Sequence, residues 1–116
     1  MQGKVVILGA GHVGSHVASA LVAGRICREI VLVDKIPGKA AAQAMDVADS
    51  LDKALGRITV RAGAYADCAD ADVTVCAIGK PREPGQTRLD LLGDSVRMVR
   101  ELEKEYLSCG QPPFII

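Results

Sequence analysis

The sequence predicts an α/β fold of three layers, in which a parallel sheet is covered by helices on both faces. Short continuous apolar runs, typical of strands buried on both sides, alternate with longer segments whose apolar residues recur at helical spacing. Hydrophobic residues occupy 49% of the 116 positions, which is enough for one core. This length fits a single domain and leaves no room for a second of ordinary size.

Five apolar runs are expected to form the strands of this sheet. They are Lys4–Leu8, Glu29–Val33, Ile58–Val60, Asp72–Ile78 and Phe114–Ile116. Because the chain stops within the last run, we expect residues 1–116 to be a truncated domain whose partner domain is absent. The alternative is that the fifth strand closes the sheet at an edge.

Three segments between these runs have the apolar periodicity of helices. The first begins at Val13 and stops at Gly24, a residue suited to a helix end. The third runs from about Leu89 to Tyr106, after a loop from Gly79 to Thr87 that contains two prolines and two glycines. The apolar stripes are Val13, Val17, Ala20 and Leu21 in the first helix; Ala41, Ala44, Met45, Ala48 and Leu51 in the second; and Leu92, Val96, Val99, Leu102 and Tyr106 in the third.

Composition argues against several classes of function. Fourteen basic residues balance fourteen acidic ones, so no net field favours nucleic acid or an anionic membrane. The chain shows no signal peptide and no apolar run near the length of a membrane span. The cysteines have no C-x-x-C spacing, which is typical of a reduced chain, so we expect a cytoplasmic protein. They are Cys27, Cys68, Cys76 and Cys109.

A G-x-G-x-x-G pattern, Gly9 to Gly14, lies directly between the first predicted strand and the first predicted helix. This context indicates a dinucleotide-binding Rossmann fold. Gly9 permits the turn out of the strand, Gly11 lets a pyrophosphate approach the backbone, and Gly14 lets the helix pack closely on the sheet. The positive end of the helix then faces the phosphates.

Asp34 ends the second predicted strand at the position where such folds bind the adenosine ribose. A carboxylate there accepts hydrogen bonds from the ribose hydroxyls of NAD but repels the additional phosphate of NADP. We therefore predict NAD as the cofactor. The alternative is that Asp34 is an ordinary turn residue.

His12 and His16 lie four residues apart and could in principle share a metal ion. They flank the glycine turn, however, where a cation would compete with the phosphates of the cofactor for space. No cysteine or carboxylate is near in sequence to complete the site. We therefore predict no metal.

The sequence resembles the lactate/malate dehydrogenase family over essentially its whole length. The matching stretches are Val6–Gly14, Val31–Asp34, Ala44–Asp46 and, most specifically, the loop signature Ala77–Leu91. The resemblance implies the NAD-binding domain of an oxidoreductase that transfers a hydride between nicotinamide and a small 2-hydroxy or 2-oxo acid. It implies cofactor contacts at Gly9, Gly11, His12, Val13, Gly14, Asp34 and Gly79.

In that family the loop closes over the substrate and contributes two arginines. Arg88 matches the arginine that polarises the substrate carbonyl, a catalytic and substrate-binding role. Arg82 matches the position where malate dehydrogenases hold the distal carboxylate, whereas lactate dehydrogenases usually have glutamine there. The resemblance therefore favours malate and oxaloacetate, with L-lactate dehydrogenase as the alternative. From the residues alone, both arginines could instead be solvated loop charges paired with Glu83 or Asp90.

The sequence departs from the family pattern in two respects. Ser95 stands where the family commonly has an asparagine near the cofactor. The catalytic histidine, its aspartate partner and the main carboxylate-binding arginine of the family would all lie beyond Ile116. A missing general acid removes about 10²–10⁴-fold of rate, so we expect the 116 residues alone to be inactive.

Other functions are compatible with parts of this pattern. A nucleotide-sensing regulatory Rossmann module would share the glycine turn and the acidic residue but has no need of Arg82 and Arg88. A methyltransferase that uses S-adenosylmethionine would need no pyrophosphate cradle. The resemblance also implies a homo-oligomer formed through the family's helix interface, with no nucleic-acid or membrane partner.

Overall fold

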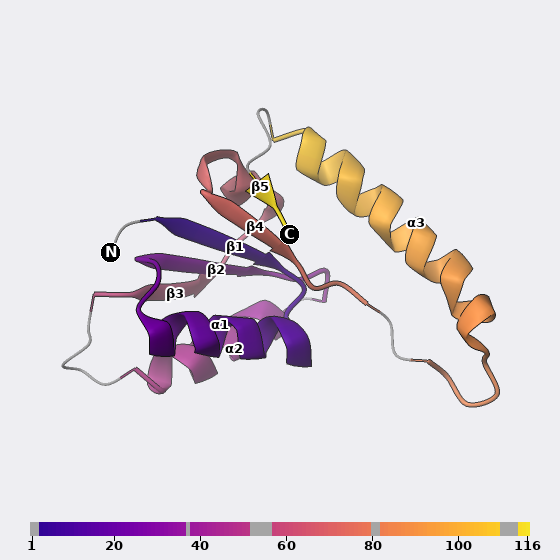
Figure 1. Ribbon diagram of the computed structural model, residues 1–116, viewed down its shortest axis with the longest axis horizontal. Coiled ribbons are helices and arrows are strands. Elements are labelled where there is room, and N and C mark those ends of the chain that lie inside the picture. The colour runs from indigo at the N-terminus through magenta and orange to yellow at the C-terminus, as the bar shows by residue number, and fades with distance from the viewer. Residues whose placement is uncertain (1–2, 37, 52–56, 80–81, 110–113) are drawn as a thin grey trace.

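A five-stranded parallel sheet forms the centre of the molecule in the computed structural model, which describes residues 3–36, 38–51, 57–79, 82–109 and 114–116 (Figure 1). The strand order is β3-β2-β1-β4-β5, and all four neighbouring pairs are parallel. The strands are β1 (Lys4–Leu8), β2 (Glu29–Val33), β3 (Thr59–Ala62), β4 (Val73–Cys76) and β5 (Phe114–Ile115). This confirms the predicted parallel α/β sheet.

Helices cover both faces of the sheet. Helices α1 (His12–Gly24) and α2 (Lys39–Asp49) lie together on one face, and α3 (Arg88–Leu107) and a 3-10 helix (Tyr65–Asp70) lie on the other (Figure 1). Alternate residues of β1 point to opposite cores, since Ile7 packs with α1 and α2 whereas Val6 packs with Leu102 and Tyr106 of α3. The three-layer Rossmann arrangement is therefore confirmed.

The faces that α1 and α2 bury coincide only in part with the predicted stripes. The buried residues are Gly14, Ala18 and Val22 in α1 and Ala40, Ala44 and Val47 in α2. Val13 is 66% exposed and Met45 65% exposed, whereas Val17, Leu21 and Leu51 of the same stripes pack against the core. Both helices have alanines on several sides, so more than one stripe fits the helical period. Small residues at the contact let each helix lie close to the sheet.

The first half of α3 projects beyond the sheet (Figure 1). Leu102 and Tyr106 are buried, but Leu92, Val96 and Val99 are 57%, 41% and 51% exposed. Only the second half of the predicted apolar stripe is therefore covered by the sheet. Periodicity identifies the apolar side of a helix, whereas burial also requires a surface that reaches it.

A network of charged side chains fixes the 3-10 helix to the sheet. The ammonium group of Lys4, in β1, donates to Asp67 at 3.2 Å and to Asp70 at 2.6 Å. The guanidinium of Arg61, in β3, donates to Asp67 at 2.6 Å and to Glu29 at 2.9 Å. Asp67 also accepts from the backbone N–H of Ala64 at 3.0 Å. These bonds, with that of Arg61 first, hold the pKa of the Asp67 carboxyl well below its usual range.

Replacement of Asp67 by asparagine should lower the free energy of unfolding at neutral pH by about 1–3 kcal/mol, because two cationic donors lose a charged acceptor. The folded-state pKa of Asp67 lies below its unfolded value near 3.9. Its contribution is therefore complete above that value and is lost as the pH falls toward the folded-state pKa. Urea unfolding at several pH values between 7 and 2 tests this.

The natural chain should lose stability more steeply below about pH 4 than Asp67→Asn does. Parallel pH profiles for the two proteins would contradict the assignment. Asp70→Asn is the matched control, because that side chain is 78% exposed and bonds only Lys4 among the ion pairs found in the described residues. Its loss of stability should be smaller.

Candidate cofactor-binding site

The glycine turn follows β1 at the carboxyl edge of the sheet. Its first residue, Gly9, has φ +107°, and a Cβ there would collide with the carbonyl oxygen of Ala77. The N–H of Gly9 donates to the carbonyl of Val33 at 2.7 Å, and the N–H of Ala77 donates to that of Leu8 at 2.8 Å. The ends of β1, β2 and β4 therefore fix the turn, and only glycine fits at position 9.

Gly11 and Gly14 have different surroundings. A Cβ on Gly14 would overlap the carbonyl oxygen of Gly9, so this glycine is required for α1 to pack on the turn. A Cβ on Gly11 would meet no atom within 4 Å, although Gly11 is the N-cap of α1. The first turn of α1 holds no acidic residue. Its N–H groups therefore face an open space suited to an anion, and a side chain at position 11 would fill part of that space.

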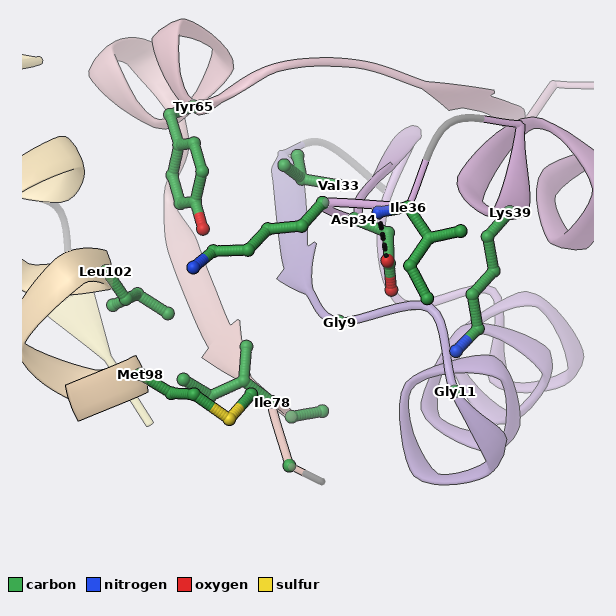
Figure 2. A pocket seen from close by; sticks show the side chains of 13 residues that line it. Gly9, Gly11, Val33, Asp34, Ile36, Lys39, Tyr65, Ile78, Met98 and Leu102 are labelled. Carbon is green, nitrogen blue, oxygen red and sulfur yellow. Dashed lines mark hydrogen bonds between the residues drawn. The ribbon is translucent and has the colours of Figure 1, made fainter. Parts of the chain in front are cut away.

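Asp34 lies directly against the glycine turn. Its Oδ2 accepts from the N–H of Ala10 at 2.8 Å, and its Oδ1 accepts from the N–H of Ile36 at 2.9 Å, the latter drawn in Figure 2. An ionised carboxylate has about four acceptor positions, so both oxygens can accept further bonds from a ligand. The two sequence motifs, the glycine turn and the acid after β2, are therefore joined into one site.

A pocket of about 330 Å³ opens between this turn and α3. Figure 2 shows Asp34 and the glycines on one side and Tyr65, Ile78, Met98 and Leu102 around the other. Of the predicted cofactor residues, Gly9, Gly11, Asp34 and Gly79 line it. His12 and Val13 are exposed in the first turn of α1, outside the lining. The pocket has one polar end and one apolar end, which suits a nucleotide.

Sequence reasoning missed several residues of this pocket. They are Lys35, Ile36, Lys39, Tyr65, Met98 and Leu102. Tyr65 lies three residues after β3, and the carboxyl ends of parallel strands share one edge of the sheet, so its position was a usable signal. Met98 and Leu102 enter from α3, and only the tertiary packing of that helix brings them near.

Arg82 and Arg88 lie together around a second, more open hollow of about 540 Å³, formed by residues 82–88. Both arginines are exposed. A turn holds the loop, in which the N–H of Gln86 donates to the carbonyl of Glu83 at 3.0 Å and Gly85 has φ +82°. The predicted loop runs from Gly79 to Thr87, of which residues 80 and 81 lie outside the described part.

Thr87 joins this loop to α3 by capping the helix. Its N–H donates to Asp90 at 2.8 Å, and its hydroxyl accepts from the N–H of Asp90 at 3.1 Å. The backbone N–H of Thr87 lowers the pKa of Asp90. Asp90 is thus engaged by the cap, and Arg88 begins the helix at a fixed position.

No group of three His, Cys, Asp or Glu side chains among the described residues is arranged to hold a metal ion. None of the described helices combines the length and apolar character that a membrane span requires.

The model of one protein family matches residues 3–116: the NAD-binding domain of lactate/malate dehydrogenase. The chain belongs to this family. An L-lactate dehydrogenase of Lactococcus lactis subsp. cremoris is 36% identical over 107 residues, which are 92% of this chain and 34% of that protein. The chain therefore spans about a third of the length of the curated relatives it matches.

Solved structures of both kinds of dehydrogenase resemble this NAD-binding domain. A lactate dehydrogenase from a Medee basin deep-sea metagenome library has a TM-score of 0.87 and 34% identity, over 98% of this chain and 36% of that one. The malate dehydrogenase of Archaeoglobus fulgidus in complex with NADH has a TM-score of 0.87 and 29% identity, over 97% of this chain and 38% of that one. These findings confirm the family, the fold and NAD as the cofactor.

Proposed function

We propose that this NAD-binding domain serves an oxidoreductase that transfers a hydride between nicotinamide and C2 of a small 2-hydroxy or 2-oxo acid, and that the acid is malate or oxaloacetate. The observation that carries the choice of acid is the pair Arg82 and Arg88 around one hollow. Two guanidinium groups around one hollow suit a substrate that presents both a carbonyl oxygen and a distal carboxylate.

The proposed cofactor site uses the pocket between the glycine turn and α3. The N–H groups at the start of α1 bind the pyrophosphate, and Asp34 accepts hydrogen bonds from the adenosine ribose. The apolar wall of Ile78, Met98 and Leu102 holds the adenine. Bound NAD supplies the nicotinamide that accepts or donates the hydride.

The proposed substrate site is the loop hollow in its closed form. Arg88 donates to the substrate carbonyl oxygen and stabilises the negative charge that develops there during hydride transfer. Arg82 binds the distal carboxylate with two parallel hydrogen bonds. Closure excludes water, so each guanidinium must find a partner on the substrate.

L-lactate dehydrogenase is the second candidate, because the relatives of highest identity described above carry that activity in their names. A lactate-type enzyme would close this loop over a methyl group and leave Arg82 without a carboxylate. The predicted homo-oligomer and cytoplasmic location stay predictions. So does the assignment of residues 1–116 as an incomplete domain that is inactive alone.

A steady-state assay tests the proposed reaction in the complete protein that contains these residues. We expect NADH oxidation with oxaloacetate to exceed that with pyruvate in kcat/KM, because only oxaloacetate pairs both arginines. Preference for pyruvate would assign the lactate reaction, and absence of turnover with either acid would contradict the dehydrogenase proposal. The isolated 116-residue chain, assayed in parallel, should bind NADH without turnover.

A further inference from the structure

The wall of the cofactor pocket beside Asp34 carries two cations. Lys35 directly follows Asp34, Lys39 begins α2, and both line the pocket. Figure 2 shows Lys39 near Gly11, on the side of Asp34 that faces the glycine turn. A phosphate placed on the ribose next to Asp34 would therefore lie within reach of lysine side chains, which partly offset its repulsion by the carboxylate.

One of these two cations is paired with a carboxylate from the opposite wall of the pocket. The ammonium group of Lys35 forms an ion pair with Glu101 of α3. Glu101 immediately precedes Leu102, which lines the pocket, so the pair joins the end of β2 to α3 across the pocket. The two side chains are 55% and 54% exposed, so this pair can open at little cost.

The effects of Lys35 and Glu101 on each other's pKa agree with this contact. Glu101 raises the pKa of Lys35 mainly through their hydrogen bond, and Lys35 lowers the pKa of Glu101. Both groups are therefore charged at neutral pH. The Glu105 carboxylate has a weaker effect of the same sign on Lys35.

We propose that Glu101 is a cofactor-specificity residue, which disfavours NADP by holding the Lys35 ammonium away from the 2′-phosphate of the adenosine ribose. NAD has no such phosphate, so a Lys35 ammonium released from Glu101 gains no new partner on NAD. The proposal rests on the placement of the ribose beside Asp34 under the proposed function. Glu101, in α3, would then be a second residue, besides Asp34, that favours NAD over NADP.

Titration calorimetry of the full chain with NADH and NADPH at low ionic strength tests this proposal. In Glu101→Gln, NADPH should bind about three- to tenfold more tightly, while NADH affinity stays within twofold. A tenfold change corresponds to about 1.4 kcal/mol, and a threefold change lies within the usual range of one exposed pair. The gain should shrink at high salt.

Two further variants separate the release of Lys35 from a general charge effect. Glu103→Gln removes the same charge from an exposed position two residues along α3 and should leave NADPH affinity unchanged. Adding Lys35→Gln to Glu101→Gln should abolish the gain. A gain that persists in this double variant, or that appears equally in Glu103→Gln, would overturn the role of the pair.

The result for NADH binding distinguishes failure of the role of Glu101 from failure of the proposed function on which it rests. If NADH binds and Glu101→Gln leaves NADPH affinity unchanged, the specificity role is wrong and the dehydrogenase proposal stands. If the natural chain binds neither NADH nor NADPH, the proposed ribose site is wrong and the role of Glu101 falls with it. All variants lie on the surface, and thermal unfolding confirms that each is folded.

Discussion

Replacement of Arg82 by glutamine is expected to shift the substrate preference of the complete enzyme toward pyruvate by about two to three orders of magnitude. Under the proposed function, the distal carboxylate pairs with Arg82 when the loop closes on oxaloacetate. When it closes on pyruvate, the guanidinium is buried without a partner, which costs about 3–5 kcal/mol. Glutamine carries no charge, so its burial against a methyl group is less costly.

The measurement is the ratio of kcat/KM for oxaloacetate to that for pyruvate in both proteins. Arg88→Gln provides the contrast, because the same change at that position should lower kcat for both acids, by about 10²–10³-fold, and leave their ratio nearly unchanged. An unchanged ratio in Arg82→Gln would show that Arg82 does not contact the distal group, and the malate assignment would be withdrawn.

Alanine at Gly14 should destabilise the domain by about 3 kcal/mol or more. A methyl group there overlaps the carbonyl oxygen of Gly9, so either α1 moves away from the turn or the turn itself deforms. Either movement disturbs the N–H of Ala10 that holds Asp34. We therefore expect both a lower midpoint of urea unfolding and a large loss of NADH affinity.

Alanine at Gly11 separates these two effects. Its Cβ meets no neighbour, and the backbone, with φ −82°, suits any residue. We expect unfolding within about 0.5 kcal/mol of the natural chain but NADH binding weakened about tenfold or more, because the methyl group takes the space of the pyrophosphate. Unchanged NADH affinity in Gly11→Ala would place the phosphates elsewhere.

The features predicted correctly depend on neighbouring residues in the sequence. The central strands are continuous apolar runs, and β1 and β2 have the predicted bounds. The turn from Gly9 to Gly14 follows from spacing, because the fold requires glycine at positions 9 and 14, and Asp34 follows from its distance from that turn. The cap of Thr87 on Asp90, by contrast, belongs to none of the predicted motifs, and it engages a carboxylate that the sequence offers as an arginine partner.

The features missed depend on packing between distant segments. The buried side of α2 could not be assigned because alanines lie on several sides of that helix, and no local rule prefers Ala40 to Ala41. The pocket wall includes Tyr65 and Met98, whose contribution depends on how the 3-10 helix and α3 lie on the sheet. The pair of Lys35 with Glu101 joins residues 66 positions apart, and neither belongs to a motif.

Helix α3 carries parts of both proposed binding regions. Arg88 is its first residue, beside the loop hollow, and Met98 lies ten residues later in the wall of the cofactor pocket. At 1.5 Å per residue the two are about 15 Å apart along the axis. A tilt of α3 that widens or narrows the nucleotide pocket must therefore also move Arg88 at its N-terminus. A change in the shape of one region is thus coupled to a change in the other.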